Sequence, residues 1–171
     1  EEVMESVRLI AEAGFTRLKL YFLVGLPEET DEDALGIAEL TKKIREVFRK
    51  GGEIILSVNP FVPKPFTPFQ WHRFEDTGVV DRRLKLIKKE LAKTGVKVME
   101  MSAKEAYMQA FLARADRRAA AIIEAASEHG WKRAIKGMEA FIEESVYSGR
   151  GKEEVLPWDI IDHGVKIEFR F

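Results

Sequence analysis

The chain has 171 residues, a formal net charge of −1, 46% hydrophobic residues and 33% charged residues. Such a chain is globular and can bury a sizeable core, as one domain or as one domain with an appendage. Its charge balance gives no overall positive field for nucleic acid or an acidic membrane surface. Cysteine is absent, which excludes disulfides and thiolate metal ligands from this chain.

The first hundred residues alternate between helical and extended patterns. We expect a helix over 1–14, a strand over 18–24, a helix from Thr30 or Asp31 to about 50, a strand over 53–58, a helix over 81–93 and a strand over 96–101. Strands separated by helix-length crossovers predict right-handed βαβ units and a parallel sheet. The nearly continuous apolar run over 18–24 predicts a strand covered on both faces.

The composition becomes mostly helical near residue 102. A capping-box pattern over 102–105 predicts the start of a long helical region from Ala103 to about Glu128. A further helix or pair of helices follows between 131 and 147, broken around Gly137, and a last strand is expected over 165–169. We therefore expect two parts, residues 1–101 and a mainly helical extension over 102–171.

Two strands end in unusual loops. Residues 54–71 run from an apolar strand into a loop that holds four of the six prolines and several aromatic rings. A loop this rigid and apolar is costly to leave in water, so we expect another segment or a partner to cover it. The strand over 18–24 ends in a turn with Gly25, Pro27, Glu28 and Glu29. Because ligands of parallel α/β folds collect at the carboxyl ends of strands, both loops are predicted to lie on the functional face.

The polar residues of these loops have two interpretations each. The Glu28 carboxylate could bind an amine or ribose hydroxyls of a ligand, or it could stabilise the N-terminus of the next helix. For Glu29, stabilisation of the helix N-terminus is the preferred interpretation. The Asn59 amide could form hydrogen bonds with a ligand or with the backbone of its own loop. The Lys64 ammonium could bind an anion, or it could simply keep an apolar loop soluble. The aromatic rings suit stacking on a planar ligand or packing against a neighbouring segment.

The remaining clusters of polar residues are weaker indications of a functional site. Asp159, Asp162 and His163 lie close in sequence and form a weak metal signal. The charges over 114–118 suit an anion contact or salt bridges, with a solvated helix face as the default. The sequence contains no Gly-rich phosphate loop and no Ser/His/Asp constellation, so we assign neither a catalytic residue nor a metal ligand.

The two strand ends together resemble the carboxyl half of the core of radical S-adenosylmethionine (SAM) enzymes, particularly the group that includes cobalamin-associated members. Residues 21–30 are similar to the fifth-strand motif of that superfamily, G-x-I-x-G-x-x-E. Leu23, Gly25 and Glu28 match the motif, whereas Tyr21 replaces its leading glycine. Residues 58–68 resemble the end of the sixth strand and the following loop. The resemblance covers about residues 1–101.

The resemblance implies a fragment of a partial (β/α)6 TIM-like barrel. In the full-length parent, a [4Fe–4S] cluster would reductively cleave SAM to start radical chemistry on an unknown substrate. The resemblance also allows cobalamin as a further cofactor of the parent. The CxxxCxxC segment of the family is missing, so the fragment alone would be inactive. The implied SAM-binding residues are Leu23, Gly25, Glu28, Val58, Asn59, Pro60 and Phe61. The implied substrate-facing loop contains Lys64, Phe66 and Trp71.

The start at Glu1 within a helical pattern indicates a piece of a longer protein. The expected partner is then the missing N-terminal half, with a homodimer or strand exchange at the exposed sheet edges as a further expectation. Absent targeting and membrane-spanning patterns favour the cytoplasm. Scarce amides beside abundant Lys and Glu favour a thermophilic source.

Two functions from other classes stay open. One is a protein-interaction or binding module that uses the loop from Phe61 to Trp71. The other is a nucleic-acid module that uses Lys64 and the basic helix over 82–93, which the acidic residues elsewhere disfavour.

Overall fold

The structure is a computed structural model that describes residues 1–48, 51–162 and 164. These residues form two compact units. Unit 1 contains Glu1–Phe61 and Thr77–Ala103, and unit 2 contains Val62–Asp76 and the described residues from Lys104 onward. The sequence-based division assigned the loop over 62–76 to the N-terminal part. The expected strand over 165–169 lies outside the described residues.

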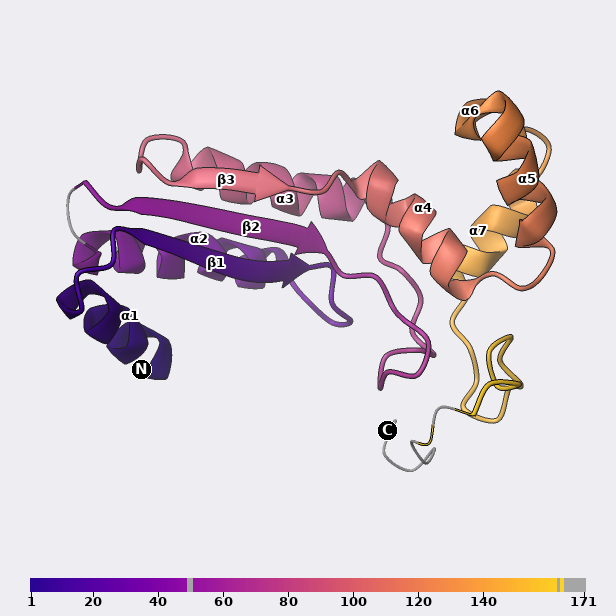
Figure 1. Cartoon of the computed structure of the whole chain (residues 1–171), viewed down its shortest axis with the longest axis horizontal. Helices are drawn as coiled ribbons and strands as arrows, with labels where there is room; N and C mark the ends of the chain where they lie inside the picture. Colours follow the sequence, from indigo (N-terminus) through magenta and orange to yellow (C-terminus); the bar gives the residue numbers. More distant parts are fainter. Residues whose placement is uncertain (49–50, 163, 165–171) are drawn as a thin grey trace. The chain divides into compact units, whose positions relative to one another are not determined.

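Unit 1 alternates helices and strands (Figure 1). Its elements are α1 (Glu2–Glu12), β1 (Arg17–Val24), α2 (Asp31–Val47), β2 (Glu53–Pro60), α3 (Thr77–Leu91) and β3 (Lys97–Glu100). The three strands form a parallel sheet in the order β1-β2-β3. The predicted mixed α/β class and parallel pairing are therefore confirmed.

Local sequence signals explain where these elements begin and end. Gly14 follows α1 with φ of 83°, a conformation that glycine adopts without steric cost. The Thr30 hydroxyl accepts a hydrogen bond from the Asp33 amide at 3.2 Å, and the Asp33 carboxylate accepts one from the Thr30 amide at 2.8 Å. This reciprocal cap fixes the start of α2. The helix α3 begins at Thr77, four residues before the predicted Asp81.

Among the described residues of unit 1, helices cover one face of the sheet and leave the other largely open. Ile54, Leu56 and Val58 of β2 are fully buried, whereas Tyr21 and Leu23 of β1 are 68% and 46% exposed. The expectation that the strand over 18–24 is covered on both faces is therefore wrong. The reason is that α2 and α3, which connect the strands, pack against each other on the same side of the sheet (Figure 1).

The covered face holds the core of unit 1. One cluster brings α1 and α2 onto the start of β2, and it contains Val7, Ala11, Ile44, Phe48 and Ile54. Val7 and Ala11 of α1 are four residues apart, as are Ile44 of α2 and its cap residue Phe48, so each helix turns one apolar stripe inward.

Unit 2 is helical apart from its loops. Its helices are α4 (Ala103–Arg114), α5 (Ala119–His129), α6 (Trp131–Ala134) and α7 (Glu139–Tyr147). The helical region expected from Ala103 to about Glu128 is present as two helices, because the chain breaks between α4 and α5. There the Asp116 carboxylate accepts hydrogen bonds from the amide and the guanidinium of Arg118 at 2.9 and 3.0 Å. Such local bonds compete with helix continuation. The predicted break at Gly137, where φ is 82°, is confirmed.

Arg114 holds unit 2 together from inside. Its side chain is fully buried, and its Nε donates to the Ser145 carbonyl at 2.9 Å. The other guanidinium nitrogens donate to the carbonyls of Gln70, His72 and Ser148. No described carboxylate forms an ion pair with it, and burial lowers the pKa of Arg114 to about 10. A solvated helix face, the default interpretation for residues 114–118, is therefore wrong for Arg114.

We predict that Arg114→Ala destabilises unit 2 by roughly 3 kcal/mol or more, since it leaves several buried carbonyls without a donor. All three tryptophans of the chain, Trp71, Trp131 and Trp158, belong to unit 2. Tryptophan fluorescence during urea unfolding therefore follows this unit alone. The exposed Arg117→Ala is the control, with an expected effect within about 0.5 kcal/mol. Equal midpoints for the two variants would contradict the assigned role of Arg114.

Candidate functional site

The carboxyl ends of β1 and β2 lie side by side. Leu23 is the register partner of Asn59, and Val24 is the partner of Pro60. The Phe61 amide continues the pairing by donating to the Val24 carbonyl at 2.7 Å. Because the strands are parallel, the loops that follow them begin at the same edge of the sheet. Six of the seven predicted SAM-binding residues lie in this stretch of the two strands and directly after it.

The turn after β1 has an unusual backbone. Gly25 is buried with φ of 85°, and Glu28 is exposed with φ of 64°. A non-glycine residue in the left-handed region is uncommon, and it persists where the surrounding structure holds it. Here the Gly25 amide donates to the Glu29 carboxylate, which closes the turn from inside.

A buried ion pair anchors this turn to α3. The side chains of Glu29 and Arg83 are only 7% and 5% exposed, and Arg83 Nη1 lies 3.0 Å from Glu29 Oε2. Arg83 also donates to the Glu29 carbonyl and, at 3.2 Å, to the Asp31 carboxylate. Burial raises the pKa of Glu29, while the Gly25 amide and the Arg83 charge lower it. The Glu29 carboxylate therefore closes the turn and pairs with Arg83, a role that differs from the predicted contribution to the start of the next helix.

Sequence reasoning missed Arg83. A signal was present, because position 83 falls on the apolar stripe of α3 with Val80, Leu84 and Ile87. An arginine on a buried stripe requires a partner, and an acidic turn is the nearest source of one. The neighbouring Arg82 instead lies outside the core with a 55% exposed side chain.

The open face of the sheet carries the side chains that a ligand could reach. Leu23 is 46% exposed, and its partner Asn59 is half-buried on the same face. Val58 lies on the covered face and is fully buried, so it can offer a ligand only its backbone. Pro60 is buried and Phe61 is half-buried.

The predicted substrate-facing residues Lys64, Phe66 and Trp71 belong to unit 2. Lys64 is exposed, and its carbonyl accepts a hydrogen bond from the Thr67 hydroxyl at 2.8 Å. Phe66 has φ of 62°, and its amide donates to Gln70 Oε1 at 3.0 Å. The structure thus groups these three residues with the C-terminal helices and separately from the strand-end residues.

The chain itself covers the aromatic loop. Trp71 is 8% exposed and packs in one cluster with Leu156 and Trp158. Trp158 Nε1 donates to Gln70 Oε1 at 2.8 Å. The expected cover is therefore residues 156–158, and Phe69, at 37% exposed, is the ring of this loop that reaches the surface most. Burial of Trp71 removes the strongest anchor of the interaction-module hypothesis.

The weak metal signal gains no geometric support. His163 lies outside the described residues, and among the described residues no three His, Asp or Glu side chains gather as a metal would require. The Asp159 carboxylate instead accepts a hydrogen bond from the Leu156 amide at 2.7 Å.

Among the residues that the structure describes, no helix has the length and apolar character to cross a membrane.

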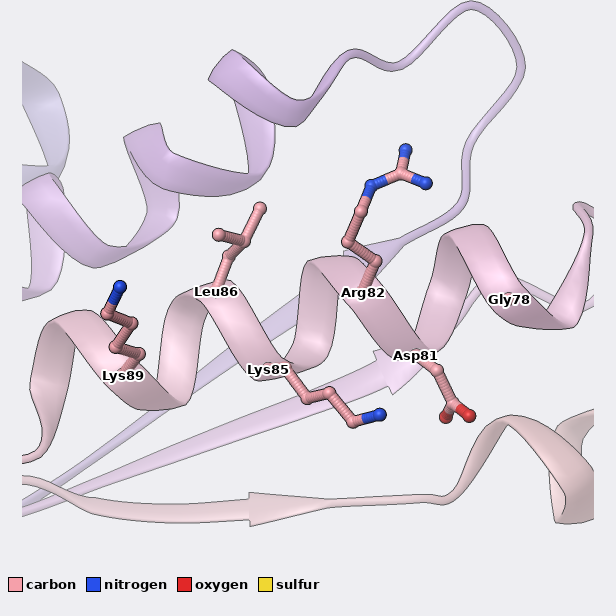
Figure 2. Close-up of a pocket in the computed structure, with 6 residues that line it drawn as sticks. All are labelled: Gly78, Asp81, Arg82, Lys85, Leu86 and Lys89. Carbon is pink, nitrogen blue, oxygen red and sulfur yellow. The ribbon is translucent and has the colours of Figure 1, made fainter.

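The basic helix of the nucleic-acid hypothesis is α3. A shallow groove of about 400 Å³ runs along it, lined by Gly78, Asp81, Arg82, Lys85, Leu86 and Lys89 (Figure 2). Figure 2 shows Arg82 and Leu86 pointing to one side of the helix and Asp81 and Lys85 to the other. Asp31 binds the Arg82 guanidinium in two bonds of 2.9 and 3.0 Å. Lys85 thus points away from Arg82 and Lys89, and the charge of Arg82 is already paired with a carboxylate. This arrangement favours a solvated helix face over a phosphate clamp.

Comparison with known proteins gives one informative match. The chain is 36% identical over 115 residues to Uncharacterized protein MJ0966 of Methanocaldococcus jannaschii. The aligned region covers 67% of this chain and 25% of that protein, so the chain spans about a quarter of the length of its curated relative. No family model matches the sequence. No solved structure matches it either.

We predict that Arg83→Met destabilises unit 1 by about 3–5 kcal/mol at neutral pH, because it leaves the Glu29 carboxylate buried without its cation. The loss raises the pKa of Glu29 further. A carboxyl with a raised folded pKa contributes stability below its unfolded pKa and loses it as pH rises. The deficit should therefore shrink below about pH 4, where Glu29 is protonated in both states.

Hydrogen exchange of the β1 and β2 amides measures this loss, and carbon NMR of Glu29 measures the pKa. Arg82→Met is the matched control, and as a surface ion-pair variant it should lose less than about 1 kcal/mol at any pH. A deficit of Arg83→Met that is independent of pH would contradict the assignment.

Proposed function

We propose that the chain is the carboxyl-terminal part of a radical SAM enzyme core and contributes one wall of its SAM-binding site. The supporting observation is the paired end of β1 and β2, where Leu23 and Asn59 are register partners on the uncovered face of a parallel sheet. The two motifs that resemble the family meet at this edge. The length of the curated relative is consistent with a longer parent.

The one-sided sheet supports a partial (β/α)6 barrel. In a barrel the helices form an outer layer and the inner sheet face carries the residues that shape the interior. In unit 1, α2 and α3 lie on one face, and the other face holds Tyr21, Leu23 and Asn59. On this proposal the open face turns toward the barrel interior, and strands from the missing N-terminal half complete the wall.

The residues present suit part of SAM. Adenine has an apolar face and a hydrogen-bonding edge, for which the exposed Leu23 side chain and the Asn59 amide are adjacent partners. The exposed Glu28 carboxylate suits ribose hydroxyls or an amine. Gly25 lets the backbone approach a ligand closely, and the Glu29–Arg83 pair holds its turn. SAM supplies the adenosyl group, and these residues position it.

The residues present do not suit the iron–sulfur cluster. Thiolates hold such clusters, and this chain has no cysteine. Cluster assembly, reductive cleavage of SAM, the use of cobalamin and the choice of substrate therefore belong, on this proposal, to the longer parent. The chain alone is expected to be inactive.

The reaction is tested on the parent protein, reconstituted with iron and sulfide under reducing conditions and supplied with SAM. We expect 5′-deoxyadenosine, detected by mass spectrometry. A parent that assembles its cluster, binds SAM and releases no 5′-deoxyadenosine would refute the enzymatic proposal.

The wall is tested separately in the same parent. Leu23→Asp places a carboxylate against the adenine, so we expect SAM binding to weaken about tenfold or more. Leu9→Asp is the matched control, because Leu9 is 57% exposed on α1, away from the strand ends. Equilibrium dialysis with labelled SAM measures both. Unchanged affinity in Leu23→Asp would remove β1 from the site even if the parent is active.

A further inference from the structure

Unit 2 contains a polar cavity of about 390 Å³. Its wall is built from the turn between α4 and α5, the end of α7 and the segment over 148–157. This volume is within the range of small-molecule sites, and every lining residue belongs to the same unit. Of these residues, the sequence analysis considered only Asp116 and Arg118, as part of the charges over 114–118 for which an anion contact or salt bridges were the alternatives to a solvated helix face.

Arg150 is the cation of this cavity whose charge is not neutralised. The other lining cation, Arg118, forms an ion pair with Asp116 at 2.8 Å. Arg150 Nη2 donates to the Arg114 carbonyl at 2.5 Å, and its guanidinium lies 5.1 Å from the centre of the Trp158 ring. These contacts orient the side chain, yet among the described residues no carboxylate lies within ion-pair distance of it. Burial lowers the pKa of Arg150.

Carboxylates face Arg150 without touching it. Glu154, Asp116 and Glu144 line the same cavity, and their charges, largest effect first, raise the pKa of Arg150 against the effect of burial. Of the three, Asp116 is already paired with Arg118. The Glu154 carboxylate accepts a hydrogen bond from the Gly151 amide at 3.2 Å. The Glu144 carboxylate forms no ion pair with any described residue. The cavity thus keeps opposite charges within electrostatic range of each other but out of contact.

A ligand with a single charge suits this wall poorly. A bare anion at Arg150 would meet the field of Glu144 and Glu154. A bare cation at Glu144 would meet the field of Arg150 and of Arg114, which is buried behind the wall at the Ser145 and Ser148 carbonyls. A ligand with both charges satisfies both groups at once, because each end lies against its opposite.

We propose that this cavity binds a small zwitterion of the α-amino-acid class, with its carboxylate on Arg150 and its ammonium on Glu144, assisted by Glu154. A guanidinium holds a carboxylate in two parallel hydrogen bonds, which suits the Arg150 fork. The site lies wholly in unit 2 and does not rest on the proposed SAM wall, so either proposal can fail without the other.

The test uses the complete chain and the standard L-amino acids, added one at a time. Propionate and ethylamine serve as probes that carry only one of the two charges. Amide shifts in nitrogen–proton NMR spectra are followed at Ser148, Gly149 and Arg150. We expect at least one amino acid to shift these amides in a saturable manner and the single-charge probes to leave them unmoved. No shift with any amino acid, or equal shifts with propionate alone, overturns the proposal.

A matched pair of variants tests the ammonium end. Glu144→Gln should weaken binding of the responding amino acid about tenfold. Glu143→Gln removes an equal charge from the preceding residue, which is exposed and outside the cavity. This control variant should bind the amino acid with unchanged affinity. Glu144 is exposed, so its substitution leaves the fold intact, whereas Arg150→Gln also removes a bond to the backbone of Arg114. Equal affinity in both glutamine variants overturns the proposal.

Discussion

Parallel pairing of β1 and β2 is the constraint on which unit 1 depends. Two strands that run the same way require the chain to return to the start of the sheet between them, and here α2 makes that return. The helix α3 does the same on the same side, so one face becomes a core and the other stays open. The same geometry sets Leu23 beside Asn59 at a common edge. The fold and the candidate site are thus products of one topological rule.

Two buried arginines, Arg83 and Arg114, hold the loops of the two units in place by binding different kinds of oxygen atom. Arg83 meets carboxylates, so the turn after β1 is held by a nearly neutral network. Among the described residues, Arg114 binds only carbonyl oxygens, so unit 2 keeps a positive charge in its interior. That charge lies directly behind the polar cavity, where it offsets the acidic residues of the wall. A structural residue therefore helps to set the electrostatic character of a surface site.

The sequence predicted the features that depend on near neighbours. The alternation of helices and strands, the start of α2 at Thr30 and the break at Gly137 follow from local capping and backbone preferences, and all are present. The predictions failed where distant segments decide. Nothing near Arg114 in the sequence indicates that its guanidinium would bind the carbonyls of Gln70, His72, Ser145 and Ser148. For the candidate site, the meeting of two strand ends was predictable, but the division between two units was not, because it depends on contacts with residues 156–158.

The hydrogen bond between Trp158 and Gln70 spans 88 positions of the chain. It has a consequence for biosynthesis. As the chain leaves the ribosome, β1, β2 and the loop that holds Gln70 emerge well before the segment that buries this loop. The aromatic rings therefore stay accessible to chaperones and to other nascent chains during that interval. Unit 1 interrupts unit 2 in the sequence, so the helical unit is the last to be completed even though its first residues are made early.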